Sequence, residues 1–502
     1  MAGLKTLAKE TAIYGLSSIV GRFLNWCLVP LYTWMFADQE YGIVSYLYSF
    51  TAVALVILTY GMETGFFRYA NKSDRPETVY TTSLISVGTT SLIFILLLSL
   101  FIHPISRAIK LPGHADYVWM LGAIVAVDAF TNIPFAYLRY KKRAIRFASI
   151  KMLNVAVNIC ANLFFLLCCP WIEKHAPATI DWFYQPLGGE AYGIGWIFIA
   201  NVVSTLVVTL MLLPDILGRK YVMDSSLLRK MLGYSWPLLI LGVAGIMSQN
   251  MGQMIIPYLF SDQEVARSMV GIYGANIKIA IIMVMFTQAF RYAYEPFIFS
   301  QAGSKDNDKG QAYCDAMKFF IILGIFIFLG VMFYLPVLKH FVGPSYWPGL
   351  DVVPIMMVAE MFMGIAFNLS LWYKLTDRTA WGMYLSVGCF IVMLGLNLVL
   401  VPLIGSPRGY MGSAWAALIA YGLMMFVSWL AGQHYYPLKY DYKRIGLYTL
   451  IAAALFVAGK YALDFPTRMW ATYLTRTALL AVYLMLIVKY EHLPLISRHT
   501  RK

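Results

Sequence analysis

Fourteen long apolar runs divide this sequence, and they constrain its fold more than any other feature. A helix that crosses a bilayer needs about 20 mostly apolar residues, and all its backbone polar groups must be satisfied internally. Continuous apolar runs, as opposed to alternating ones, exclude a transmembrane β-barrel. We therefore expect an all-α membrane protein with 14 transmembrane helices. The expected spans are 12–35, 41–62, 80–102, 118–138, 150–169, 192–213, 232–257, 270–292, 316–335, 352–372, 380–402, 410–432, 444–463 and 471–489.

The composition also indicates lipid as the solvent. Of the 502 residues, 60% are hydrophobic and 13% are charged, whereas an ordinary soluble domain has about 45–50% and about 25%. A soluble fold of this size needs more polar surface than this chain can supply. Secreted enzymes, cytosolic enzymes and disordered scaffolds are excluded. The N-terminal apolar run is interpreted as a first span and not as a cleaved signal peptide.

The distribution of lysine and arginine predicts the orientation. With the N-terminus inside, the inner segments carry 28 of these residues, the outer loops carry 8, and 3 lie within spans. Basic residues accumulate in cytoplasmic loops, so both termini are expected in the cytoplasm. The net charge of +14 is explained in the same way, without nucleic acid as a partner.

The first six spans resemble the next six. The segment FADQEYGIVSY (36–46) after the first span is similar to FSDQEVARSMVGIY (260–273) after the seventh. Three further matches occur in the same order, namely Asn132 with Asn368, Asn162 with Asn397, and Gly193 with Gly412. Six spans is an even number, so both halves have the same membrane topology, as in parallel-repeat transporters.

The repeat predicts the domain organisation. We expect two pseudo-symmetric six-helix lobes, the N-lobe at 1–215 and the C-lobe at 216–435, followed by two additional helices and a cytoplasmic tail at 436–502. Two similar lobes with a cleft between them are the architecture of alternating access.

Polar and charged side chains inside the spans are the candidates for a translocation cavity, because ionisable residues are costly in lipid and mark transport pathways. Asp128 and Asn132 share one helical face, as do Arg22 and Asn25, because each pair has a spacing of three or four residues. The candidate cavity residues are Arg22, Asn25, Asp128, Asn132, Gln249, Asn250, Gln253, Lys278, Arg291 and Glu360.

Structural alternatives exist for several of these positions. Arg22 either lines the cavity or forms a buried ion pair with Asp128. Asn154, Asn158 and Asn162 repeat at every fourth residue and are interpreted mainly as interhelical contacts. Arg476 in the last span is expected to extend toward the membrane surface.

The cavity residues suggest the chemistry of the cargo. Arginine binds phosphate through two parallel hydrogen bonds and lysine supplies a point charge, so Arg22 and Lys278 suit an anionic group. Neighbouring amide and hydroxyl side chains suit sugars, although an amphipathic drug also fits. The sequence contains no phosphate-binding loop, HExxH motif, nucleophile elbow or catalytic carboxylate pair, and the six cysteines lack metal-ligand spacing. We therefore expect no enzyme activity, no metal and no cofactor.

Two segments carry a resemblance to a known family. Pro30 is followed by EYGIVSY (40–46) and then by YGMETGFFRYANK (60–72), and FTQAFRYAYEPFIFS covers 286–300. These segments resemble the polysaccharide transporter family, whose oligosaccharide flippases belong to the multidrug/oligosaccharidyl-lipid/polysaccharide exporter superfamily. The resemblance implies a flippase in the bacterial cytoplasmic (inner) membrane that moves lipid-linked oligosaccharide, such as an O-antigen or lipopolysaccharide precursor, from the inner to the outer leaflet. It also implies that cations on the first and eighth helices line the cavity.

Two other functions compete with this one. A cation-coupled multidrug exporter of the same superfamily needs acidic residues in its lobe cavity, a role open to Asp128 and Glu360. A membrane glycan polymerase or acyltransferase needs a catalytic constellation that the sequence lacks. The expected coupling ion is H⁺ or Na⁺. The expected partners are the lipid-linked oligosaccharide, membrane lipids, and the glycan polymerase or glycosyltransferases of the same pathway.

Overall fold

The computed structural model describes residues 15, 20–302, 309–376, 378, 380–462 and 469–491, and this part of the chain is almost entirely helical. Within these described residues, thirteen helices are long and apolar enough to cross a membrane. Each coincides with one of the expected spans from the second to the fourteenth, which confirms those thirteen. Residues 12–14 and 16–19 of the first expected span lie outside the described residues, and the described remainder includes α2 (Leu28–Met35).

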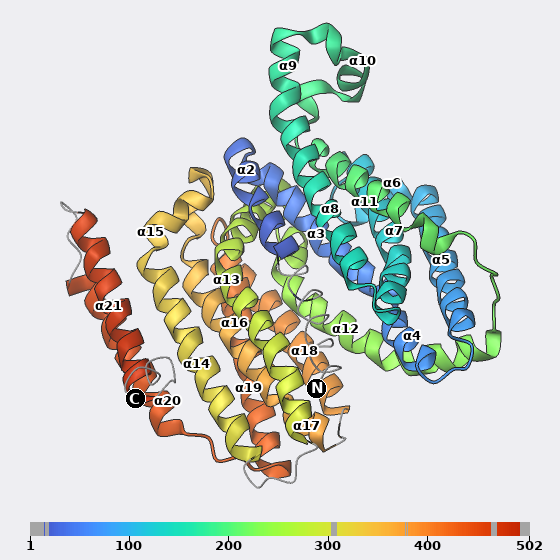
Figure 1. The fold of residues 1–502 in the computed structure, drawn as a ribbon. Helices are drawn as coiled ribbons and strands as arrows, with labels where there is room; N and C mark the ends of the chain where they lie inside the picture. Colours follow the sequence, from blue (N-terminus) through green and yellow to red (C-terminus); the bar gives the residue numbers. More distant parts are fainter. Residues whose placement is uncertain are drawn as a thin grey trace, which may run out of the picture. The chain divides into compact units, whose positions relative to one another are not determined.

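The described residues form two compact units (Figure 1). Unit 1 comprises Met1–Gly274 and Ser386–Ser413, and unit 2 comprises Ala275–Leu385 and Ala414–Lys502. Three long helices contribute residues to both units: α13 (Gln263–Ala302), α18 (Ala380–Ile404) and α19 (Tyr410–Tyr435). The lobe boundaries expected at residues 215 and 435 stay a prediction.

The other helices of unit 1 are α3 (Asp38–Thr59), α4 (Met62–Ala70), α5 (Pro76–Leu100), α6 (Ile102–Ala108), α7 (Ala115–Tyr140), α8 (Ala144–Leu163), α9 (Cys169–His175), α10 (Asp181–Tyr184), α11 (Gly195–Ile216) and α12 (Ser225–Leu259). Figure 1 shows α5, α7, α8 and α11 beside one another. Their shared core includes the fully buried side chains of Phe66, Tyr80 and Leu138. The core depends on packing density, because lipid is as apolar as these side chains.

The ends of α7 and α11 carry charged networks near the basic loop 139–151. The Glu77 carboxylate forms ion pairs with Lys141 Nζ at 3.0 Å and with Arg219 Nη1 at 3.2 Å. This carboxylate raises the pKa of Lys141. The buried carboxylate of Asp215 lies 2.7 Å from Arg146 Nη2. Several basic residues in the segments expected on the cytoplasmic side therefore also hold neighbouring helices together.

Two positions of the sequence repeat have the same hydrogen bonds. Asn162 Nδ2 donates to the carbonyl of Asn158 at 2.8 Å, and its Oδ1 accepts from Tyr32 at 2.9 Å. Asn397 Nδ2 donates to the carbonyl of Met393, also at 2.8 Å, and its Oδ1 accepts from Ser413 at 2.7 Å. Each buried asparagine thus donates a hydrogen bond to a carbonyl of its own helix and accepts one from a hydroxyl group of another helix. This local geometry supports the repeat.

Helices α3 and α13 cross at glycines within unit 1. A Cβ atom on Gly42 would lie 2.0 Å from the carbonyl oxygen of Arg267, and one on Gly271 would lie 1.9 Å from that of Asp38. Ser268 donates a hydrogen bond to Asp38 Oδ2 at 2.5 Å beside this crossing. Only glycine lets two helix backbones approach so closely. The crossing joins the two segments, 36–46 and 260–273, that reveal the repeat.

The other helices of unit 2 are α14 (Lys309–Phe333), α15 (Leu335–Leu338), α16 (Val352–Leu369), α17 (Leu371–Leu375), α20 (Tyr442–Val457) and α21 (Met469–Tyr490). The two C-terminal helices pack against α14 through a core that includes Phe333, Tyr448 and Tyr483. Short 3-10 turns, η5 (Lys339–Phe341) and η6 (Pro344–Gly349), precede α16, and a π-helical turn, η7 (Ala458–Ala462), follows α20.

Charged residues connect both ends of α21 to neighbouring helices and turns. Near its start, Arg476 is 7% exposed, and its guanidinium donates to the carbonyls of Phe333 and Gly459 at 3.0 and 3.3 Å. These two carbonyls, at the end of α14 and in η7, hold the guanidinium within the protein. The expectation that Arg476 extends toward the membrane surface stays a prediction. After the end of α21, the buried Glu491 carboxylate lies 2.7 Å from Lys318 of α14 and 3.3 Å from Arg444 of α20.

Candidate functional site

Unit 1 brings three helices together around an acidic residue in a span. Asp128 of α7 is accessible, and the side chains that act on its carboxylate include Thr205 of α11 and Lys151 of α8. Lys151 is half-buried, with its Nζ 3.9 Å from the ring centroid of Phe135. Lys151 is therefore a cation near enough to act on Asp128. The two alternatives considered for Arg22 from the sequence stay predictions.

A second pair of charges extends this cluster. Arg139, three turns along α7 from Asp128, forms an ion pair with Glu63 of α4, and each side chain is 31% exposed. The Arg139 guanidinium also lies over the Phe67 and Phe147 rings, 5.2 and 5.7 Å from their centroids. Both Arg139 and Glu63 act electrostatically on Lys151. Two cations and two carboxylates thus balance one another, which lowers the cost of placing four charges within spans.

The balance of this cluster determines what it can do. We define the charged cluster as Glu63, Asp128, Arg139 and Lys151. A proton or small cation that binds Asp128 weakens its attraction to Lys151, and an anion that binds Lys151 competes with Asp128. A bound ion would therefore change the electrostatic balance of the cluster.

A ladder of amides joins the first span to α8. Asn158 Nδ2 donates to Asn25 Oδ1 at 3.2 Å, and Asn162 Nδ2 donates to Asn158 Oδ1 at 3.1 Å. The interpretation of these asparagines as interhelical contacts is supported, and Asn25, a candidate cavity residue, takes part in the ladder. Arg22 lies one turn before Asn25 and is accessible. Since lipid does not solvate a guanidinium, an accessible arginine at this position suits a watery path.

The candidates on α12, together with Asn132, have different surroundings. Gln249 is accessible, whereas Asn250 Nδ2 donates to the carbonyl of Ile246 on its own helix at 2.8 Å. Gln253 is directed toward α13, with Nε2 3.5 Å from the position of a Cβ atom on Gly274. Asn132 is half-buried on α7. Of these four, Gln249 is the one whose side chain is most available to a ligand.

Unit 2 contains the remaining candidates, Lys278, Arg291 and Glu360. Lys278 of α13 and Glu360 of α16 are both half-buried, and Arg291 is exposed with its guanidinium 4.2 Å from the Phe367 ring centroid. One turn after Glu360, a Cβ atom on Gly364 would lie 2.9 Å from Thr287 Oγ1 of α13. The α16 face that carries Glu360 thus packs closely on α13. That these residues share a cavity with Arg22 and Asp128 stays a prediction, because the latter belong to unit 1.

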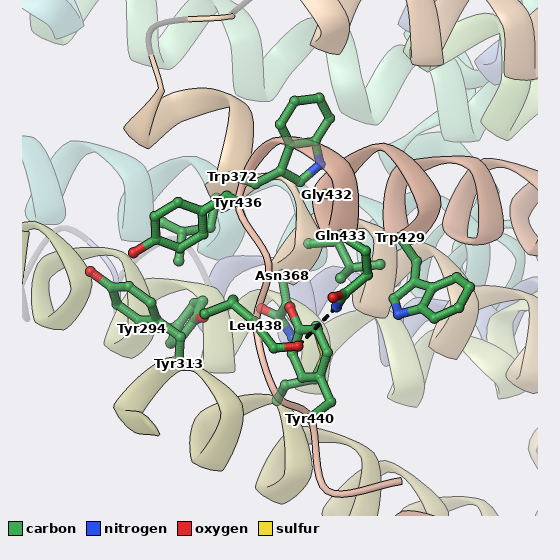
Figure 2. Close-up of a pocket in the computed structure, with 13 residues that line it drawn as sticks. Tyr294, Tyr313, Asn368, Trp372, Trp429, Gly432, Gln433, Tyr436, Leu438 and Tyr440 are labelled. Carbon is green, nitrogen blue, oxygen red and sulfur yellow. Dashed lines mark hydrogen bonds between the residues drawn. The ribbon is translucent and has the colours of Figure 1, made fainter. Parts of the chain in front are cut away.

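Two cavities in unit 2 differ in the ligands that they admit. Figure 2 shows an aromatic cavity of about 10 Å³ that Asn368, Trp372 and Tyr440 help to line, with Gln433 bonded to the carbonyl of Leu438 at 3.0 Å. This volume holds at most one water molecule, so the cavity is not a substrate site. A neighbouring cavity of about 350 Å³ between α14, α16, α19 and α20 is lined almost entirely by apolar side chains. In the described part of the chain, no three His, Cys, Asp or Glu side chains form a group that could bind a metal.

Sequence reasoning did not identify Lys151, Glu63 and Thr205 as site residues. Lys151 was counted with the basic loop 139–151, although it lies two turns inside α8. The sequence did contain a sign of these partners, because Asp128 and Arg139 are 11 residues apart and share one face of α7. That face needs compensating charges from its neighbours, and α4 and α8 supply them.

Comparisons with known proteins agree on family and fold. The family model described as "Polysaccharide biosynthesis protein" matches residues 7–300. A search of curated proteins gives no match. Among solved structures, the lipid II flippase MurJ in an inward closed conformation has a TM-score of 0.72 at 11% identity, covering 96% of this chain and 99% of that one.

Multidrug transporters have the same fold. An inward-facing MATE family transporter of the MOP superfamily has a TM-score of 0.64 at 13% identity, covering 86% of this chain and 96% of that one. A MATE structure in the straight conformation has a TM-score of 0.57 at 14% identity, with coverages of 89% and 97%. At these identities the likeness concerns the fold, which is that of a multi-pass membrane transporter.

Proposed function

The chain belongs to the polysaccharide biosynthesis protein family, and from this membership we propose that it is a flippase for lipid-linked oligosaccharides. It moves the precursor from the inner to the outer leaflet of the bacterial cytoplasmic membrane by alternating access. The family match is the observation that carries this proposal, and the transporter fold supports it.

The accessible polar residues of unit 1 suggest how the cargo is held. Arg22 binds the phosphate of the lipid carrier, because a guanidinium forms two parallel hydrogen bonds to phosphate oxygens. Gln249 and Asn132 offer amide groups to sugar hydroxyls.

We expect Arg22→Ala to reduce flipping more than tenfold while the protein still inserts in the membrane, because the substitution removes a cation that grips phosphate. Lipid-linked oligosaccharide would be counted in the outer leaflet of vesicles that contain the purified protein. Arg22→Lys, which keeps the charge, should retain part of the activity. Arg107→Ala, which removes an exposed arginine from α6 outside the spans, is the matched control. Flipping by Arg22→Ala at the wild-type rate would contradict the proposal.

A cation-coupled multidrug exporter is the second candidate, and the accessible Asp128 in its charged cluster favours it. An acidic residue in a lobe can bind H⁺ or Na⁺ and exchange it for an organic cation. A strain without the protein would then become sensitive to cationic dyes, and Asp128→Asn would not restore resistance. Under the flippase proposal, the same strain accumulates undelivered lipid-linked oligosaccharide and keeps its dye resistance.

For a flippase, Asp128 and Glu360 serve the return of the empty carrier. Outward movement of a doubly charged pyrophosphate is favoured by about 2.3 kcal/mol per charge per 100 mV of negative inside potential. The empty carrier must then return with its cavity cations, and a bound H⁺ or Na⁺ on Asp128 or Glu360 assists this step. Asp128→Asn and Glu360→Gln should therefore bind substrate but turn over slowly. Turnover independent of these changes, of ion gradients and of potential would leave downhill facilitation as the mechanism.

The orientation can be tested by cysteine labelling. Gln39 and Lys142 are both exposed, and the distribution of basic residues places the first outside and the second in the cytoplasm. An impermeant thiol reagent applied to intact cells should label Gln39→Cys and not Lys142→Cys. Gln39 is preferable to Asp38, which is bonded to Ser268. Labelling of Lys142→Cys in intact cells would contradict the predicted orientation.

A further inference from the structure

A cavity of about 450 Å³ in unit 2 belongs to none of the sites described above. It lies where four spans end or begin, namely after α14 and α20 and before α16 and α21. The lining residues are Met332, Phe333, Leu335, Pro336, Lys339, Leu350, Asp351, Pro354, Phe456, Lys460 and Arg476. Four spans that meet at one end place the cavity at a membrane–water interface. The topology prediction assigns this end to the outer leaflet.

The charged residues that line the cavity are mostly positive. Among the described lining residues, three are cations, Lys339, Lys460 and Arg476, and one is a carboxylate, Asp351. Arg476 is fixed in place by the carbonyls of Phe333 and Gly459. Asp351 directly precedes α16, an 18-residue helix whose N-terminal end partly offsets the carboxylate charge. The lining therefore favours an anion.

The two lysines come from different elements. Lys339 begins η5, and its Nζ lies 4.4 Å from the Trp347 ring centroid. Lys460 lies in η7 and is exposed. A held guanidinium and two lysine ammonium groups that line one cavity suit a phosphate.

The remaining lining residues are apolar. Leu335, Pro336, Leu350 and Phe456 have no polar side-chain atom to offer, so a small hydrated anion would leave most of the cavity wall in contact with water. An amphipathic ligand matches both the charged and the apolar lining residues, with its anionic group on the cations and its hydrocarbon on the apolar wall. At a membrane interface, such a molecule is a lipid.

We propose that this cavity binds the phosphate of an anionic phospholipid of the outer leaflet, with the first part of an acyl chain on the apolar wall. The site goes beyond the proposed transport function, since it involves residues of unit 2 alone and none of the candidate cavity residues. A bound lipid here connects α14, α16, α20 and α21, and so completes the attachment of the C-terminal helix pair.

Native mass spectrometry of the purified full-length protein can test the proposal, with phosphatidylglycerol as the probe and phosphatidylcholine of the same acyl chains as the neutral comparison. We expect preferential retention of phosphatidylglycerol, with the affinity at least tenfold lower in the double variant Lys339→Ala/Lys460→Ala. The matched control is Lys439→Ala/Lys443→Ala, which removes two exposed lysines from around the start of α20. Arg476 stays unchanged because it also holds backbone carbonyls.

A gain-of-binding variant keeps the test independent of folding defects. Asp351→Asn removes the carboxylate from the described lining, so it should bind phosphatidylglycerol several-fold more tightly than the wild type. Equal retention of phosphatidylglycerol by the wild type, the double lysine variant and Asp351→Asn would overturn the proposal. Displacement of the lipid by inorganic phosphate at equal concentration would overturn the assignment to a lipid. Both results are independent of flipping activity, which is measured separately.

Discussion

Gly42→Ala is expected to reduce transport more than tenfold and to lower the thermal unfolding temperature clearly. The new Cβ atom would lie 2.0 Å from the carbonyl oxygen of Arg267, a backbone atom that cannot rotate away. The helices α3 and α13 must then separate, which weakens the hydrogen bond between Ser268 and Asp38. Overpacking of this kind costs about 1–3 kcal/mol, and more when backbone is involved. Gly271→Ala should have the same effect from the other helix.

The chain offers matched controls for this prediction. Gly245 of α12 and Gly395 of α18 lie in unit 1, and a Cβ atom on either meets no atom within 4 Å. Alanine there should be neutral or slightly stabilising, because glycine is a poorer helix former by about 1 kcal/mol. Unfolding temperatures in detergent and the flipping assay would be measured for all four variants. If Gly42→Ala behaved like Gly245→Ala, the close crossing would not exist in the protein.

Glu491→Ala is expected to detach the C-terminal helix pair from α14. The Glu491 side chain is 2% exposed and the Lys318 side chain 8% exposed, so the substitution leaves a buried ammonium without its principal partner. Removal of one member of a buried pair costs about 3–5 kcal/mol. The loss of unfolding free energy should lie toward the lower end of this range, because Asp315 remains 3.4 Å from Lys318. Limited proteolysis between α19 and α20 and the unfolding temperature would report the detachment.

A double variant separates the charge effect from simple loss of packing. Glu491→Ala/Lys318→Met removes both charges and keeps apolar volume at Lys318, so it should recover much of the lost stability. Lys443→Ala, an exposed lysine near the start of α20, is the control. A Glu491→Ala protein with wild-type unfolding temperature and protease resistance would show that this carboxylate does not hold the helices.

The spans were predictable because their cause is local. Hydrocarbon accepts a helix when about 20 consecutive residues are apolar, whatever their distant neighbours are. The thirteen spans in the described part of the chain match the expected ones for this reason. The repeat was also visible, and the equivalent hydrogen bonds of Asn162 and Asn397 give it a structural counterpart. Those two asparagines could be matched because the repeat retains residue type and order.

The candidate site was only partly predictable. Asp128 was recognised because an acidic residue in a span is costly and rare. Its neighbours Lys151 and Thr205 were not, since they come from α8 and α11, and their proximity depends on how those helices pack on α7. The surroundings of Arg476 depend on packing in the same way, because the carbonyls that hold its guanidinium belong to α14 and η7.

The sequence by itself determined that the chain is a helical membrane protein with a repeated six-span pattern, because apolar length and residue periodicity act within a single helix. Only the tertiary structure decided which charges pair, which glycines permit a helix crossing, and which cations line a common cavity. Lys151 acts on the Asp128 carboxylate, Gly42 packs against the Arg267 backbone, and Lys339 lines the same cavity as Arg476. The members of each pair are more than 20 residues apart, and contacts at that separation follow from the rotation and spacing of packed helices, which local composition does not encode.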